Sequence, residues 1–334
     1  MVSRSPNSIN ITMKNIIQLM AGNVEITITE KDIKNTLTYY DLGNFIYYEN
    51  LSFGYSNENF KVTTSKGNVL FRLYKQKSEE NVKKEMLLMS ALRRINFPTA
   101  YPLDDNEGRY IHPINNYSSL FFQFMEGKHP ELNSNTAGEV GKAIGTLSIL
   151  SVKDIYKKEN SISIENCLNI IQEFPKAKYQ YPEIFEYFKE QTDYLKKYIS
   201  EELPKGIVHG DCFPDNTIFN GDKLKAIIDF EEFCYETLIY DLGMTINGFC
   251  FKDNNLQNDL MLSLKHEYEC LRELTDKENE LLPYYIQWAA HGMLYWHLRN
   301  NMLYTLNPTQ VERVRELMNR VKNLRKIDIN KNNR

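Results

Sequence analysis

Cysteine is scarce in this sequence, and the few that occur are scattered. Cys167, Cys212, Cys234, Cys250 and Cys270 form no C-x-x-C pair and no cluster with the spacing of zinc ligands. An odd number of cysteines without the regular spacing of a disulfide framework argues against a secreted domain held together by disulfides, and it fits a reducing compartment. The sequence therefore gives no reason to expect structural disulfides or structural zinc.

Long apolar runs and export signals are also lacking. No stretch approaches the roughly 18 apolar residues that a membrane-spanning helix needs, and the N-terminus lacks the apolar run of a signal peptide. The formal net charge of -4 gives no reason to expect a nucleic-acid partner. We expect a soluble cytoplasmic protein, a monomer or homodimer, that binds neither membranes nor nucleic acids.

The length of 334 residues is too great for one ordinary domain and suits two lobes. Apolar and polar residues alternate in two runs, 59–63 and 69–74, on either side of a polar turn at 64–68, which predicts a β-hairpin. Ser78 precedes two glutamates and predicts the start of a helix, and 119–124 predicts a further strand.

Most of the rest of the chain has a helical pattern. Residues 1–35 are expected to form a short extension and a first helix, and a strand-rich block covers about 203–230. Later helices are expected at about 134–150, 165–200, 255–273, 278–303 and 308–326. The pattern predicts an α+β fold with a small N-terminal lobe, residues 1–125, and a larger, mostly helical C-terminal lobe, residues 126–334. Glu126-Gly127 is the expected hinge between them.

The most informative segment is HGDCFPDN, residues 209–216, which follows an apolar run that is typical of a strand. Asp229 comes thirteen residues after Asn216, at the end of another apolar run. A single aspartate after a strand is usually a turn residue or a helix cap. Several constrained positions in this order, each at a strand end, instead favour a functional site.

Phosphoryl transfer needs a group that accepts the proton of the attacking hydroxyl, and oxygen ligands for magnesium. An H-x-D-x-x-x-x-N loop supplies both. We therefore predict that Asp211 is the catalytic base and that Asn216 and Asp229 bind Mg²⁺ beside ATP. His209 is expected to lock the loop in place rather than to carry protons.

Two charged residues in the N-terminal lobe suggest where the phosphates bind. Arg72 lies on the strand face opposite Phe71 and Leu73, and Glu85 lies on the apolar stripe of the following helix. A buried carboxylate needs a partner, so we predict an ion pair between Arg72 and Glu85 that places a cation over the phosphates. The alternative is that Glu85 faces water at the edge of its stripe.

A short polar stretch around Gly54 and Ser56 precedes the hairpin. One glycine among small polar residues would let backbone N–H groups approach a phosphate. The same stretch is also compatible with an ordinary turn.

With these residues in place, the chain resembles the aminoglycoside phosphotransferase and choline kinase superfamily, and within it the bacterial homoserine kinases. The resemblance covers about residues 35–310 and is sharpest over 206–251. There HGDCFPDN is followed by Ile228-Asp229-Phe230, by Tyr240-Asp241-Leu242 and by TINGFC at 245–250. The resemblance implies a bilobal protein-kinase-like fold and an ATP- and magnesium-dependent kinase that phosphorylates a metabolite hydroxyl.

The resemblance also implies roles for further residues. Asp241 would support the catalytic loop through hydrogen bonds, and the backbone from Gln123 to Met125 would line the adenine site. The acceptor would lie near the helices after Asp241, with four candidate contacts: Asn247, Trp288, Trp296 and Arg299.

Three functions remain open at this point. The first is homoserine kinase. The second is a choline or ethanolamine kinase, because the aromatic residues of 284–304 would suit a cation–π box, although aromatics at helical spacing are usually core. The third is a nucleotide-binding pseudokinase with a scaffolding role. It is motivated by Arg72, Ser148 and Leu294, which stand where relatives often have Lys, His and Arg. An antibiotic kinase is disfavoured because 284–304 contains no acidic residue.

Overall fold

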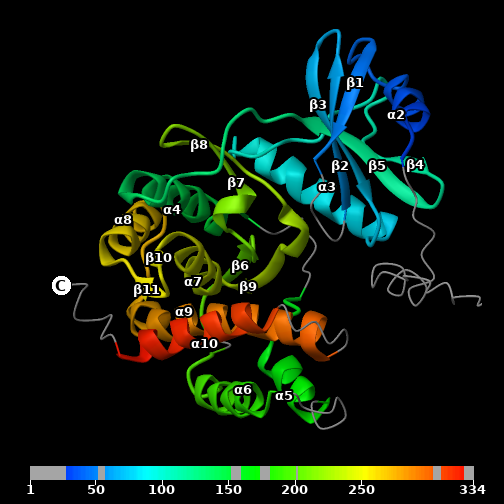
Figure 1. The fold of residues 1–334 in the computed structure, drawn as a ribbon. Helices are drawn as coiled ribbons and strands as arrows, with labels where there is room; N and C mark the ends of the chain where they lie inside the picture. The colour runs from blue at the N-terminus through cyan, green and yellow to red at the C-terminus, as the bar shows by residue number, and fades with distance from the viewer. Residues whose placement is uncertain are drawn as a thin grey trace, which may run out of the picture.

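The computed structural model describes residues 28–51, 57–151, 159–173, 181–200, 202–303 and 310–326. Figure 1 shows an N-terminal antiparallel sheet with helices on its two faces, joined to a mostly helical C-terminal part. The α+β class predicted from the sequence is confirmed. The expected extension before residue 28 lies outside the described residues.

The N-terminal sheet has five antiparallel strands in the order β1-β2-β3-β5-β4. They are β1 (Phe45–Asn50), β2 (Asn57–Thr64), β3 (Gly67–Tyr74), β4 (His112–Ile114) and β5 (Tyr117–Gln123). The hairpin β2–β3 is the one that the alternating pattern predicts, because two runs of alternating apolar and polar residues with a polar turn between them pair locally. Gly67, with φ +127°, follows its tight turn.

Side chains of β3 alternate between two apolar cores, as a strand in the middle of a sheet requires. Phe71 and Leu73 pack on the face that carries α2 (Glu30–Leu37). Tyr74 packs on the other face, with α3 (Glu79–Arg94). Arg72 is therefore on the α3 face, opposite Phe71 and Leu73, as predicted. The side chain of Ser78 caps α3, which confirms the predicted start of this helix.

The C-terminal part contains helices and three two-stranded ribbons. The helices are α4 (Ser134–Ser148), α5 (Ile164–Glu173), α6 (Pro182–Leu195), α7 (Leu238–Phe249), α8 (Asn258–Glu269), α9 (Asp276–His297), the π-helical segment η4 (Leu298–Leu303) and α10 (Val311–Lys326). The ribbons are β6 (Lys205–Val208) with β9 (Cys234–Thr237), β7 (Thr217–Asn220) with β8 (Lys223–Ile227), and β10 (Phe251–Lys252) with β11 (Asn255–Leu256). Two 3-10 turns, η2 (Pro214–Asn216) and η3 (Phe230–Glu232), follow the strands that carry the motif.

Two helical predictions differ from the structure. The segment predicted as one helix at 165–200 contains two helices, α5 and α6, and Pro182 occupies the first turn of the second. The helix α7 was missed. Eleven of its residues are buried, so the helix is covered on all sides and its sequence lacks the period of an amphipathic helix.

The main apolar core crosses the predicted boundary at residue 125. It runs from Leu120 and Phe122 of β5, through α3, to Ala137 of α4 and on to α9. The division into lobes at 125/126 stays a prediction. Every helix in the part of the chain that the structure describes is too short or too polar to span a membrane.

Candidate active site

The catalytic-loop motif begins at the end of β6 and is held by a carboxylate from α7. The backbone N–H groups of His209 and Gly210 each donate to one oxygen of Asp241, both at 2.9 Å. Asp241 is buried in the first turn of α7, where the helix dipole favours a negative charge. The contact that the family resemblance implies for Asp241 is therefore present.

The ring of His209 fixes the loop from its other side. Its Nδ1 accepts the backbone N–H of Asp211 at 3.2 Å, so its proton is on Nε2, which donates to the carbonyl of Ile228 at 3.0 Å. Burial lowers the pKa of His209, and the neutral ring suits this pattern. These contacts support the predicted role of a structural lock.

Gly210 is required at its position for two reasons. Its φ of +80° lies in the left-handed region, and a Cβ there would lie 2.8 Å from the carbonyl oxygen of Glu232. A larger residue would push the loop away from η3 and displace the side chain of Asp211.

Asp211 lies in the site with a second polar side chain against it. The amide nitrogen of Asn216 donates to the Asp211 side chain at 2.9 Å and to its backbone carbonyl at 2.8 Å. Burial, and after it the charge of Asp229, raises the pKa of Asp211 to about 8. A carboxyl group with this proton affinity suits a general base that works near neutral pH.

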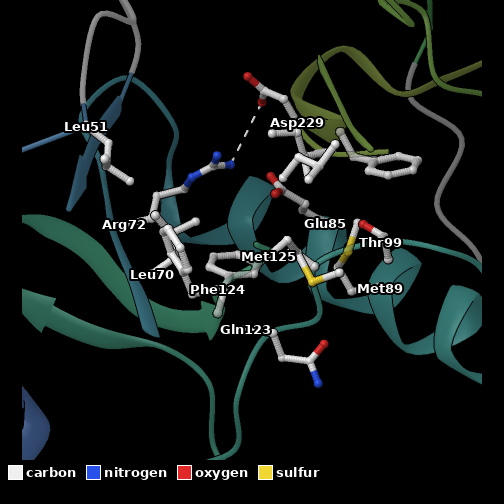
Figure 2. Close-up of a pocket in the computed structure, with 15 residues that line it drawn as sticks. Leu51, Leu70, Arg72, Glu85, Met89, Thr99, Gln123, Phe124, Met125 and Asp229 are labelled. Atoms are coloured by element: carbon white, nitrogen blue, oxygen red, sulfur yellow. Dashed lines mark ion pairs between the residues drawn. The ribbon is translucent and has the colours of Figure 1, made fainter. Parts of the chain in front are cut away.

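Asp229 follows β8 in a left-handed conformation, with φ 65°. This conformation is uncommon outside glycine and is held here by its neighbour, because the Ile228 N–H donates to the carbonyl of Asn216 at 2.9 Å. The turn brings the carboxylate of Asp229 towards the N-terminal sheet, where its Oδ1 lies 3.8 Å from Nη1 of Arg72 (Figure 2).

The predicted ion pair between Arg72 and Glu85 is wrong, although both side chains line one cleft (Figure 2). The buried carboxylate of Glu85 accepts hydrogen bonds from Tyr74 Oη at 2.8 Å and Lys77 Nζ at 2.7 Å. The need of a buried carboxylate for a cation was correctly inferred. Lys77, just beyond β3, forms the ion pair with Glu85, and the guanidinium of Arg72 faces Asp229 instead.

The cleft between the sheet, α3 and the catalytic segment spans about 630 Å³, part of it open to solvent. One end carries the charged groups of Arg72, Glu85 and Asp229, and the rest is mostly apolar, with Leu70 and Met89 among the lining residues. A pocket that is apolar at one end and charged at the other matches an aromatic base joined to phosphates.

The adenine-site prediction falls on the rim of this cleft. Gln123 and Met125 both line it. The side chain of Gln123 is exposed, and its backbone N–H donates to the carbonyl of Tyr101 at 2.9 Å. Gly54 and Ser56, predicted near the phosphates, lie outside the described residues.

The four predicted acceptor contacts are not among the described residues that line the cleft. Asn247 is buried and donates to the carbonyls of Gly243 and Ile286, so it links α7 to α9. Trp288 is buried beside His291. Trp296 is 44% exposed, and Arg299 is exposed in η4. The positions of Asn247 and Trp288 do not support a direct contact with substrate.

The residues present fit a magnesium ion. Oδ1 of Asp229 is buried and accepts no hydrogen bond from any residue that the structure describes. Asn216 turns its amide nitrogen to Asp211, so its amide oxygen is the atom left for a ligand. Burial, and after it the charge of Asp229, raises the pKa of Glu231 to about 7.

Within the described ranges, no group of three or more His, Cys, Asp or Glu side chains is placed to hold a metal by itself. This agrees with the way proteins bind magnesium, through one or two carboxylates together with substrate phosphates and waters.

Two functional candidates were missed by sequence reasoning. Asn59 accepts a hydrogen bond from Nε of Arg72 at 2.8 Å and lies directly opposite it in the β2–β3 register. Its place could have been found by pairing the two predicted strands across their turn. Lys77 follows β3, and its reach to Glu85 depends on how α3 packs, which no local pattern reveals.

Comparison with known proteins agrees with this geometry. The model of the phosphotransferase enzyme family (APH) matches residues 48–274. The homoserine kinase of Rhizobium rhizogenes (strain K84 / ATCC BAA-868) is 29% identical over 262 residues, which is 77% of this chain and 81% of the relative.

Two solved structures have a similar fold. An amicoumacin kinase, hAmiN, in complex with AMP-PNP, Ca²⁺ and Ami, gives a TM-score of 0.70 at 16% identity, and the match covers 94% of this chain and 97% of that one. A microcompartment-associated aminopropanol kinase gives 0.69 at 15% identity, with coverage of 89% and 97%.

The fold and the site together define a small-molecule kinase with a protein-kinase-like architecture. The chain belongs to the phosphotransferase enzyme family, whose matched region includes the cleft, the catalytic loop and Asp229.

Proposed function

We propose that this chain is a homoserine kinase, which transfers the γ-phosphoryl group of ATP to the side-chain hydroxyl of homoserine. The products are O-phosphohomoserine and ADP. The observation that carries the proposal is the placement of Asp211, held by Asn216, near Asp229, which meets Arg72 at the charged end of the cleft. The choice of homoserine is supported by the similarity to homoserine kinases at 29% identity.

Each residue of the site has a role in this reaction. Asp211 accepts a hydrogen bond from the attacking hydroxyl and takes its proton as the oxygen bonds to phosphorus. Asn216 and the Asp241-bound loop keep the carboxylate of Asp211 in line with the phosphate. Arg72 binds phosphate oxygens with its terminal nitrogens, a contact that a planar guanidinium makes well.

Magnesium is the expected cofactor beside ATP. When bound, it neutralises charge on the phosphates and orients them for displacement. The ligands from the protein would be Asp229, which lines this end of the cleft, and Asn216, whose amide oxygen is left open by the contacts of its amide nitrogen. The two residues are far apart in the sequence, and the hydrogen bond from the Ile228 N–H to the carbonyl of Asn216 holds their segments together.

Recognition of the acceptor is assigned to the exposed end of α9 and to η4. An amino-acid substrate needs a cation for its carboxylate, and Arg299 is the exposed arginine of η4. A cation–π box for choline receives less support, because Trp288, Tyr285 and Tyr295 of the aromatic segment are buried in the core. A scaffolding role would need loss of a catalytic group, and Asp211, Asn216 and Asp229 are all present.

The test is a comparison of acceptors. ATP consumption with Mg²⁺ would be measured for homoserine, choline, ethanolamine and an aminoglycoside, with ATP alone as the blank. We expect kcat/KM for homoserine to exceed that for the other three by at least about 100-fold, because binding differences of a few kcal/mol separate such substrates. Faster turnover of another acceptor would reject homoserine. Binding of ATP without transfer to any acceptor would instead favour a pseudokinase.

A further inference from the structure

The guanidinium of Arg72 is nearly enclosed. The residue is 8% exposed, and its guanidinium carbon lies 5.8 Å from the ring of Tyr74 and 5.5 Å from that of Phe122. Burial opposes the charged form, but nearby groups, Tyr74 and Asp229 foremost, hold the pKa of Arg72 above its usual value. A charged group that is so little hydrated must have its N–H donors directed by neighbouring residues.

The orientation of the guanidinium is set by a hydrogen bond at Nε. Nε of Arg72 donates to Oδ1 of Asn59 at 2.8 Å, across the paired strands β2 and β3. A guanidinium is planar, so a bond at Nε fixes its plane and with it the position of Nη1. Nη1 then faces Asp229, at 3.8 Å (Figure 2).

Glu85 does not make this contact. Its carboxylate is engaged by Tyr74 and Lys77 and is 2% exposed. Lys77 neutralises Glu85, so the orientation of Arg72 is left to its neighbour in the sheet. Asn59 is not among the described residues that line the cleft, and any effect it has on the ligand passes through Arg72.

We propose that Asn59 is a positioning residue of the nucleotide site, which orients Arg72 towards the phosphates of ATP. This inference rests on the proposed function only in that Arg72 binds those phosphates. Lysine has a single side-chain nitrogen, whereas arginine can be held at Nε while its terminal nitrogens bind.

A double-mutant cycle tests this role. Affinity for ATP with Mg²⁺ would be measured by calorimetry on the full chain, on Asn59→Leu, on Arg72→Lys and on the double variant. We expect Asn59→Leu to weaken ATP binding by about tenfold, the effect of losing one hydrogen bond to a charged group. In the Arg72→Lys background the same change should alter affinity by less than about twofold, because Nε is absent.

Two further readouts separate positioning from a general effect on folding. Asn59→Leu should raise the KM for ATP and leave the KM for the acceptor unchanged. Thr63→Val is the matched control, since Thr63 lies on the same strand and face and bonds to Asn68 away from the cleft, and it should leave ATP affinity unchanged.

Equal weakening by Asn59→Leu in both backgrounds would overturn the proposal, as would unchanged affinity in the Asn59→Leu variant. Binding is measured without an acceptor, so these results do not depend on whether homoserine is the substrate. Failure of the unaltered chain to bind ATP would reject both the proposed function and the role of Asn59.

Discussion

At the scale of single residues, His291 shows how a buried titratable group couples stability to pH. The side chain is fully buried in α9, its Nε2 contacts Thr192 Oγ1 at 2.8 Å, and its ring stacks on Phe188. Burial, and after it the charge of Arg325, lowers the pKa of His291 to about 3. The folded protein therefore keeps this imidazole neutral at a pH where the unfolded chain protonates it.

The sign of the effect follows from proton counts. Below about pH 6.5 the unfolded chain binds the proton and the folded chain does not, so stability falls as the pH is lowered. Between about pH 7.5 and 5.5, His291 should account for a loss of about 1.4 kcal/mol in the free energy of unfolding. Denaturant titration of His291→Leu should show this part of the pH dependence removed. Thr192→Val, which keeps the histidine, should retain it; equal pH dependence in all three proteins would contradict the assignment.

Some of the predicted site residues are positioned by contacts that are local in the sequence, and others by contacts between distant elements. Asp211, Asn216 and Asp229, which the sequence predicts as site residues, lie near one another because the motif and the ends of two strands define their positions locally. The partner of Glu85 was not found from sequence, because Lys77 and Arg72 both lie within reach and only the packing of α3 decides between them. Trp288 is aromatic at helical spacing, and the structure gives it the core position that such spacing usually indicates.

At the scale of elements, α4 and α8 approach closely because α4 presents glycines to its neighbour. A Cβ at Gly141 would lie 2.1 Å from the carbonyl oxygen of Leu264, a backbone atom that cannot move without shifting α8. At Gly138 the nearest atom is the side-chain oxygen of Ser263, at 3.0 Å. The two glycines lie on the same helix, but an added Cβ would meet a backbone atom at Gly141 and a side-chain atom at Gly138.

Gly141→Ala should lower the free energy of unfolding by about 2 kcal/mol or more, since overpacking outweighs the better helix propensity of alanine. Gly138→Ala, the matched control, should change it by less than about 1 kcal/mol, because propensity and a mild contact oppose each other. Chemical denaturation of both variants measures the difference. If the two substitutions have the same effect, backbone approach is not what the glycine at 141 provides.

Elements with a clear period or a local cap were predictable from sequence. The β2–β3 hairpin and the start of α3 at Ser78 were predicted because short-range pairing and capping determine them. The helix α7 was not, because burial on all sides removes the period that marks a helix. Its importance is nonetheless large, since it carries Asp241 and supports the catalytic loop.

At the scale of the whole molecule, one apolar core joins α3 and the cleft face of the sheet to the helices of the C-terminal part, among them α7, which holds the catalytic loop through Asp241. Arg72 from the sheet and Asp229 from the C-terminal part meet across the cleft through this packing. A nucleotide bound there would touch both parts at once. The sequence indicated the two groups of elements, but the side chains that meet between them depend on packing over long range.

The central claim is that Asp211 is the base of a phosphoryl transfer to homoserine. The most direct measurement compares the rate of O-phosphohomoserine formation by the unaltered chain and by Asp211→Asn, with ATP affinity measured for both. We predict that kcat falls by about 10²- to 10⁴-fold in Asp211→Asn. ATP affinity should be unchanged, because Asp211 faces the acceptor. An Asp211→Asn variant that phosphorylates homoserine at the rate of the unaltered chain would contradict the claim.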